Sequence, residues 1–115
     1  MFDRLRGTRD FLPNEMAARK KVFSSIKKSV EEFGFFETDT PAIELFELYS
    51  IKSGEEIIEE LYAFEDKGGR MISLRPELTP SVVRVLVSRA KELSFPVKWY
   101  SIPRLWRYER PQSGR

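Results

Sequence analysis

A short glycine-containing turn between two strand-like segments constrains the fold of this chain more than any other feature. Residues 61–65 and 70–74 are rich in strand-forming side chains, and Lys67-Gly68-Gly69 lies between them. Strands joined by so short a connection pair antiparallel, because a parallel pair needs a crossover of a dozen residues or more. The sequence therefore predicts an antiparallel hairpin over residues 61–74.

The residues before this hairpin predict a long amphipathic helix that leads directly into a strand. Pro13 suits a first helical turn, and Gly34 suits a C-terminal stop. Apolar residues recur between them at helical spacing, at Met16, Phe23, Ile26, Val30 and Phe33. Residues 35–38 are strand-like and precede Pro41, which interrupts backbone hydrogen bonding.

The pattern over residues 44–60 is less regular and predicts two short helices. Leu45, Leu48 and Tyr49 favour the first, and residues 55–60 favour the second, with Ser53-Gly54 between them. The glutamates at 55–60 are expected on a solvent-facing side of that helix, so we assign them no metal.

The second half of the chain predicts one more helix and two strands. Thr79-Pro80 has the pattern of an N-cap and a first-turn proline, so we expect a helix from there to about Leu93. Residues 97–102 and 105–109 have strand character. Together these elements indicate an α+β fold, with a mainly antiparallel sheet flanked by helices, rather than the alternating order of a Rossmann domain. No glycine-rich phosphate-binding fingerprint occurs, so a nucleotide would be held by side chains.

The composition excludes several classes of function. The 115 residues include 41% hydrophobic and 13% aromatic side chains, enough for one globular domain. Cysteine and histidine are both absent, which rules out disulfides, thiolate metal sites and histidine general bases within these residues. The net charge of +2 supports nucleic-acid binding only weakly. Without an apolar run of roughly 20 residues or a signal-like start, we expect a cytoplasmic protein with no membrane partner.

The first candidate site is Arg75-Pro76-Glu77-Leu78-Thr79-Pro80, at the junction of a predicted strand and helix. The carboxylate of Glu77 and the hydroxyl of Thr79 can together accept hydrogen bonds from a ligand ammonium group. The alternative is local: Thr79 caps the helix, and Glu77 interacts favourably with the positive helix end. That alternative leaves the role of Arg75 open.

The second candidate site is the segment around Arg107 and Glu109. On a strand these two side chains share one face, while Trp106 and Tyr108 share the other. A guanidinium suits a phosphate and a carboxylate can accept from the amine of a base, so the pair could hold the two ends of ATP. The alternative is a solvent-exposed ion pair worth about 0 to 1 kcal/mol.

The third candidate is the basic loop that follows, with Arg110, Gln112 and Arg115 beside the flexible Gly114. Such a loop can close over polyphosphate or contact an RNA end. A charged loop that is only well solvated is the alternative.

Four segments, in order, resemble histidyl-tRNA synthetases, which are class II aminoacyl-tRNA synthetases. Residues 6–13 resemble the opening of that family, and residues of about 15–45 resemble its motif 1. Residues 75–80 resemble its amino-acid loop, and residues 97–115 resemble a partial motif 2. The resemblance implies that residues 1–115 are the N-terminal part of a catalytic domain whose C-terminal remainder is missing, with no anticodon-binding domain present.

The resemblance also implies roles for individual residues. Glu77 and Thr79 would hold the α-ammonium group of the amino acid. Arg107 would bind the α-phosphate of ATP and act in catalysis by stabilising charge. Glu109 would accept from the adenine amine, Arg115 would reach the outer phosphates, and Gln112 would approach the tRNA acceptor end.

The implied reaction is the activation of histidine with ATP and its attachment to tRNA(His). ATP would be a substrate, accompanied by Mg²⁺, and no organic cofactor would be needed. The protein would form a homodimer through its motif 1 region. This segment alone is expected to be inactive, since the rest of the site lies elsewhere in such enzymes. The alternatives are a synthetase-like regulatory subunit of ATP phosphoribosyltransferase and a binding module that only dimerises.

Overall fold

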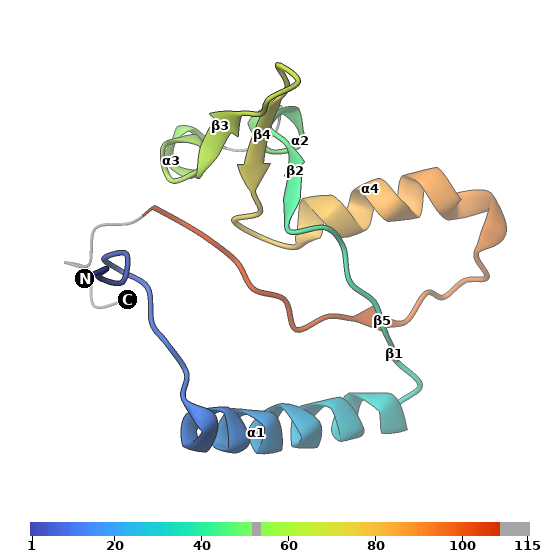
Figure 1. Ribbon diagram of the computed structural model, residues 1–115. Coiled ribbons are helices and arrows are strands. Elements are labelled where there is room, and N and C mark those ends of the chain that lie inside the picture. Colours follow the sequence, from blue (N-terminus) through green and yellow to red (C-terminus); the bar gives the residue numbers. More distant parts are fainter. Residues whose placement is uncertain (52–53, 109–115) are drawn as a thin grey trace. The chain divides into compact units, whose positions relative to one another are not determined.

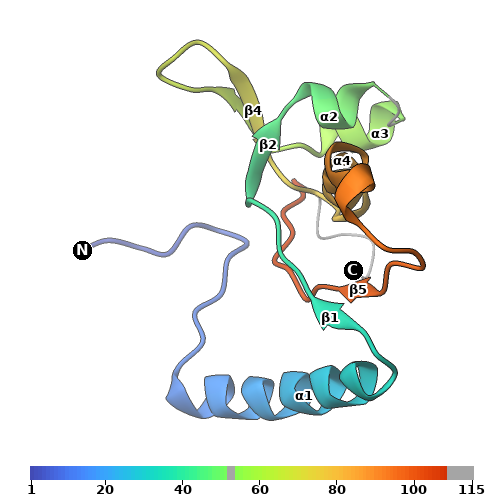
Figure 2. The same ribbon diagram turned by 90° about the vertical axis from the view of Figure 1, so that its right-hand side faces the viewer.

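The computed structural model describes residues 1–51 and 54–108, and the chain divides into two compact units (Figure 1, Figure 2). The first unit comprises Met1–Phe36 and Lys98–Tyr100. The second comprises Glu37–Val97 and Ser101–Arg115. Helices and strands occur together, which confirms a mixed α and β architecture with a small sheet.

The first unit is built on the predicted long helix, α1 (Pro13–Glu32). Gly34 ends it with a φ of 85°, a left-handed conformation that favours glycine. The Gly34 N–H donates to Glu31 O and the Phe35 N–H donates to Val30 O, the pair of bonds that defines a Schellman motif. The chain then enters β1 (Phe36–Glu37), which pairs with β5 (Trp99–Tyr100). The predicted helix and strand are confirmed, although both strands are shorter than predicted.

The segment before α1 is attached to the helix by stacked arginine and aromatic side chains. The Arg19 guanidinium lies 5.0 Å from the centre of the Phe11 ring and 5.1 Å from that of Phe23. Arg9 covers the same Phe11 ring at 4.7 Å and forms an ion pair with Glu15. These cation–π contacts hold residues 9–11 against the first two turns of α1.

The second unit contains a three-stranded antiparallel sheet in the order β2 (Ile43–Leu45), β4 (Met71–Leu74), β3 (Ala63–Glu65). Its β3–β4 hairpin confirms the predicted one, with Phe64 opposite Ile72. Gly69, at a φ of 85°, makes the turn. The prediction that Leu45 is helical is wrong, because Leu45 lies in the edge strand β2. It pairs instead with Ile72 of β4.

The helices of the second unit follow the predicted order. The two short ones are α2 (Glu47–Ser50) and α3 (Glu55–Glu59). The longer one is α4 (Thr79–Arg89), which continues as the 3-10 turn η1 (Ala90–Glu92). The prediction that Thr79 caps this helix is wrong. Leu78 occupies the N-cap position and Thr79 is already helical, so the Thr79 side chain does not cap α4.

The centre of the second unit is small and unusually polar. Tyr49 of α2 is fully buried, as are Ser73 of β4 and Ser81 of α4, and the Arg75 side chain is almost fully buried. Burial raises the pKa of the Tyr49 hydroxyl, and the neighbouring Ser81 hydroxyl partly offsets that increase. The most buried side chains of this unit are therefore mainly polar, where an aliphatic core would be usual.

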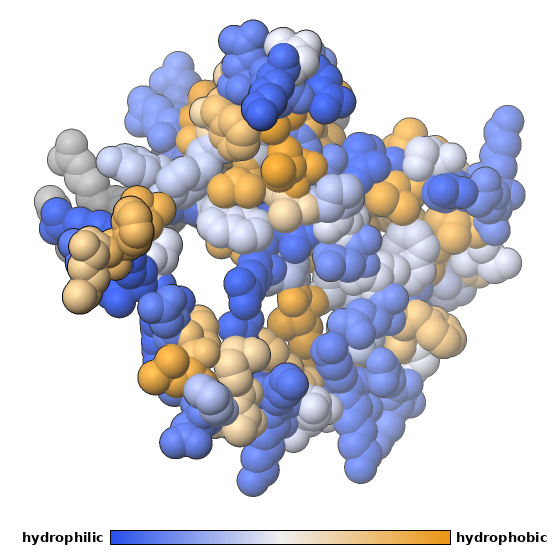
Figure 3. All heavy atoms as spheres, viewed as in Figure 1, coloured by the Kyte–Doolittle hydropathy of each residue, from blue (hydrophilic) through white to orange (hydrophobic). Residues whose placement is uncertain are grey.

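Many large apolar side chains of both units remain exposed. On α1 and just beyond it they include Val22, Ile26, Phe33 and Phe36, with exposed fractions between 45% and 73%. Figure 3 shows apolar surface among polar side chains along α4 as well. Exposed apolar surface on this scale is typical of faces that another protein segment covers. Among the described residues, no helix has the length and apolar character needed to cross a bilayer.

The Asp66 carboxylate in the β3–β4 turn predicts that the local stability of this hairpin depends on pH. The Asp66 carboxylate accepts hydrogen bonds from the backbone N–H groups of Gly68 and Arg70 and from Arg70 Nε. The Arg70 backbone and side chain hold the pKa of Asp66 below its ordinary value of 3.8.

A lowered folded-state pKa stabilises the hairpin above the ordinary pKa, and this stabilisation is lost as pH falls through the lower folded value. We expect hydrogen exchange at the Arg70 amide, corrected for intrinsic rate, to become faster as pH falls below about 4. The Asp66→Asn variant should exchange faster at neutral pH and lose this pH dependence. Equal protection of the two proteins at pH 6 would contradict the assignment.

Candidate functional site

The loop between β4 and α4 carries the first candidate site. Pro76 is fully buried at its start, Glu77 is half-buried, and Thr79 is exposed at the first position of α4. Glu77 and Thr79 line one hollow of about 830 Å³. Its apolar lining includes Leu48 of α2, Ile51 directly after α2, and Val83 and Val87 of α4.

This arrangement brings together a carboxylate and a hydroxyl at one side of a mostly apolar hollow. Such a combination is usual for small-ligand sites, where a few polar groups fix the orientation of the ligand. Glu77 can accept a charge-assisted hydrogen bond from a cation, and Thr79 can add a second acceptor. The two residues are therefore placed together in a way that suits an ammonium group.

Arg107 is held beside this loop by hydrogen bonds to the backbone. Its Nε donates to the carbonyl oxygen of Pro76 at 3.1 Å, one residue before Glu77. The flanking N–H groups are also bound: Trp106 N lies 3.0 Å from Arg75 O, and Tyr108 N lies 2.8 Å from Glu60 O. The structure thus joins two segments, around residues 77 and 107, that were separate candidates in the sequence.

The predicted strand over residues 105–109 does not form in its described part, residues 105–108. A ladder needs one continuous partner strand, whereas the carbonyls bound by Trp106 and Tyr108 come from two places, Arg75 after β4 and Glu60 before β3. The Tyr108 ring packs edge-on against Tyr62, with 5.7 Å between ring centres. Glu109, Arg110, Gln112, Gly114 and Arg115 lie outside the described residues.

Arg75 is the site residue whose role the sequence left open. Its Nη1 donates to Thr40 O at 2.7 Å and to Asp39 Oδ1 at 3.1 Å, while its Nε donates to Arg104 O at 2.9 Å. The Thr40 N–H and the Arg75 guanidinium hold the pKa of Asp39 below its ordinary value, although burial opposes them. The only sequence signal was an arginine directly before a proline at a strand end.

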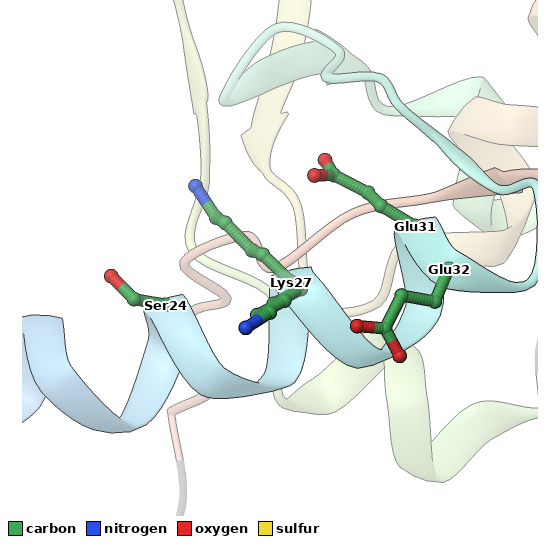
Figure 4. A pocket seen from close by; sticks show the side chains of 5 residues that line it. Ser24, Lys27, Glu31 and Glu32 are labelled. Carbon is green, nitrogen blue, oxygen red and sulfur yellow. The ribbon is translucent and has the colours of Figure 1, made fainter.

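A second hollow lies on α1, and none of the predicted site residues that the structure describes lines it. It is formed by Ser24, Lys27, Lys28, Glu31 and Glu32. Figure 4 shows Glu31 and Glu32 projecting to different sides of this one helix, and all the described residues that line the hollow belong to α1. In residues 1–51 and 54–108 there is no group of three or more potential metal ligands. We assign neither a ligand nor a metal to this face.

Comparison with known proteins gives consistent results. The sequence model of the family described as histidyl-tRNA synthetase matches residues 7–115. The histidine–tRNA ligase of Halorubrum lacusprofundi is 55% identical over 115 residues, covering all of this chain and 26% of that protein. The chain therefore spans about a quarter of the length of the curated relatives it matches.

Solved structures resemble this chain over most of its length. Apo histidyl-tRNA synthetase from S. aureus is 30% identical, with a TM-score of 0.81 over 94% of this chain and 30% of that one. A Bacillus halodurans protein titled ATP phosphoribosyltransferase regulatory subunit/histidyl-tRNA synthetase is 24% identical, with a TM-score of 0.85, over 96% of this chain and 29% of that one. At that identity the second likeness shows the fold alone.

Proposed function

This chain belongs to the histidyl-tRNA synthetase family, and we propose that it is the N-terminal segment of the catalytic domain of a longer histidine–tRNA ligase. The observation that carries the proposal is the hydrogen bond from Arg107 Nε to Pro76 O. It places a guanidinium suited to phosphate next to the loop whose Glu77 and Thr79 suit an ammonium group. A site that joins an amino acid to ATP needs these two functions side by side.

In the proposed first step, a carboxylate oxygen of histidine attacks the α-phosphorus of ATP. The bond from that phosphorus to the bridging oxygen breaks, and pyrophosphate leaves with the electron pair. Glu77 and Thr79 hold the α-ammonium group, and Arg107 stabilises the negative charge that builds up on the α-phosphate oxygens. In the second step, a terminal hydroxyl of tRNA(His) attacks the acyl carbon and AMP leaves.

Three further roles fall on residues outside the described part of the chain. Glu109 would accept from the adenine amine, Arg115 would bind the outer phosphates, and Gln112 would contact the tRNA acceptor end. ATP is a substrate here and Mg²⁺ would accompany it. The reaction as written needs no organic cofactor.

Charging of tRNA(His) by the longer protein tests the proposed function. We expect ATP-dependent attachment of histidine to tRNA(His) and no attachment of the other amino acids. A protein that attaches no amino acid but raises the activity of ATP phosphoribosyltransferase would contradict the proposal and establish the regulatory alternative.

The role of Glu77 gives a quantitative prediction. In the longer protein, Glu77→Gln should raise the KM for histidine about 10- to 100-fold, because a charge-assisted hydrogen bond is worth about 1.5 to 3 kcal/mol. The KM for ATP should change far less. Glu59→Gln on the exposed side of α3 is the matched control and should leave both constants unchanged. An unchanged KM for histidine in Glu77→Gln would remove Glu77 from the site.

We also propose that the apolar side of α1 contributes to a homodimer. Ile26 and Phe33 are 45% and 73% exposed there, although their periodicity is that of a buried face. A charge buried at such an interface should weaken association, so Ile26→Glu should raise the dimer dissociation constant about tenfold or more. Lys21→Glu, on the polar side of α1, should not. Sedimentation velocity that shows the same dissociation constant for both variants would contradict this interface.

A further inference from the structure

We infer that Arg75 is a positioning residue that fixes the segment carrying Arg107 against the loop carrying Glu77, and that it influences adenylate formation through Arg107. The inference rests on the proposed function. It goes beyond that function because it gives a role to Arg75, to which the proposed function assigns no substrate contact.

The Arg75 side chain is buried and bonded along two edges. One edge faces the segment before β2, where Nη1 donates to Thr40 O at 2.7 Å, to Thr40 Oγ1 at 3.2 Å and to Asp39 Oδ1 at 3.1 Å. The other edge faces the segment before Arg107, where Nε donates to Arg104 O at 2.9 Å. Only 4% of the residue is exposed, so the guanidinium has little freedom to take another position.

Backbone carbonyl groups at Arg75 and Pro76 also bind the segment of residues 104–107. The first of them belongs to Arg75. Its carbonyl oxygen accepts from Trp106 N at 3.0 Å, and the next carbonyl, that of Pro76, accepts from Arg107 Nε at 3.1 Å. Residues 75–76 and 104–107 are therefore linked by at least three hydrogen bonds. Because these three involve Arg75 or its immediate neighbour, a shift of Arg75 shifts the base of the Arg107 side chain.

Charge pairing is not the main effect of this arginine. Its ionic partner Asp39 has 74% of its side chain exposed, so water screens most of the attraction between the two charges. The bonds to the carbonyls of Thr40 and Arg104 instead exploit the several N–H groups of a planar guanidinium. A lysine has one nitrogen and cannot reproduce donors on both edges.

A double-mutant cycle in the longer protein tests the inference. Arg75→Lys keeps the positive charge but removes the donor to Arg104 O, and a misplacement of about 1 Å can cost 100-fold in rate. We expect it to lower kcat/KM for ATP, measured by histidine-dependent pyrophosphate exchange, about 10- to 100-fold. In an Arg107→Ala background, the same substitution should lower kcat/KM less than about twofold, because the residue it positions is absent. Losses that multiply in the double variant would overturn the inference.

Arg70→Lys is the matched control. Arg70 also donates from Nε, to Asp66 Oδ2 at 2.7 Å in the same unit, and among the described residues no hydrogen bond joins its side chain to residues 104–107. Its effect on kcat/KM, whatever its size, should be the same with and without Arg107. A cycle between Arg70 and Arg107 as strongly coupled as that of Arg75 would show that general loss of structure explains both.

A second variant tests the inference without altering Arg75. Asp39→Asn removes the ionic partner but leaves the bond from Arg75 Nε to Arg104 O, so kcat/KM for ATP should change less than about threefold. A tenfold loss would contradict a positioning role that works through Arg104.

The two proposals can fail separately. If the unmutated longer protein shows no histidine-dependent exchange, the proposed function fails. If the longer protein is active and the cycle between Arg75 and Arg107 is additive, only the role of Arg75 fails.

Discussion

Replacing Arg107 by alanine in the longer protein should lower kcat for histidyl-adenylate formation by about 100- to 1,000-fold. The guanidinium is held beside the Glu77 loop by its bond to Pro76 O, so it is oriented before ATP arrives. Preorganised charge is worth most in the transition state, where negative charge on the α-phosphate increases. The loss should therefore appear mainly in kcat, with a smaller rise in the KM for ATP.

Arg104→Ala is the control for this substitution. It removes another exposed arginine three residues earlier but leaves the Arg104 carbonyl, which accepts from Arg75. Pyrophosphate exchange by Arg104→Ala should stay within about threefold of the unmutated protein, the range expected of a surface substitution. If Arg107→Ala kept most of its exchange activity, or if both variants lost it equally, Arg107 would not be the residue that stabilises the reacting phosphate.

Replacing Tyr49 by alanine should destabilise the second unit by about 3 to 5 kcal/mol, the range for removing a buried aromatic ring. Tyr49 of α2 is fully buried, with the Ser81 hydroxyl of α4 as a neighbour of its own hydroxyl. Its loss would leave a cavity beside Ser81, whose hydroxyl group cannot fill it. Native-state hydrogen exchange of the β4 amides measures this effect within the longer protein, where global unfolding need not be a single transition.

Tyr49→Phe separates the ring from its hydroxyl. Among the described residues, the buried hydroxyls of Tyr49 and Ser81 make no hydrogen bond of acceptable geometry. Removing a hydroxyl that lacks a good partner costs little, so Tyr49→Phe should change stability by less than about 1 kcal/mol. A loss for Tyr49→Phe as large as that for Tyr49→Ala would show that the hydroxyl, and not ring packing, stabilises the unit.

Features set by neighbours in sequence could be predicted from the sequence. Gly34 ends α1 because its left-handed conformation is a local property, and Gly69 makes the β3–β4 turn for the same reason. The hydrophobic periodicity of α1 and the order of the short helices could also be predicted from the sequence. The cap of α4 was misplaced by one residue, a common uncertainty at helix ends.

Features set by distant contacts could not be predicted in this way. Strand β2 exists because Leu45 pairs with Ile72, and nothing near Leu45 indicates that partner. The position of Arg107 depends on the carbonyl of Pro76, and that of Arg75 depends on Thr40 and Arg104. The candidate residues themselves came from chemical character and from their resemblance to one family, but the hydrogen bonds that join them are tertiary.

Histidine-dependent exchange of pyrophosphate into ATP tests the central claim most directly. The longer protein should catalyse exchange with histidine and not with the other amino acids, and the 115-residue chain alone should catalyse none, because it spans only about a quarter of the length of its relatives. Exchange by the longer protein that does not depend on histidine, or no exchange at all, would contradict the account.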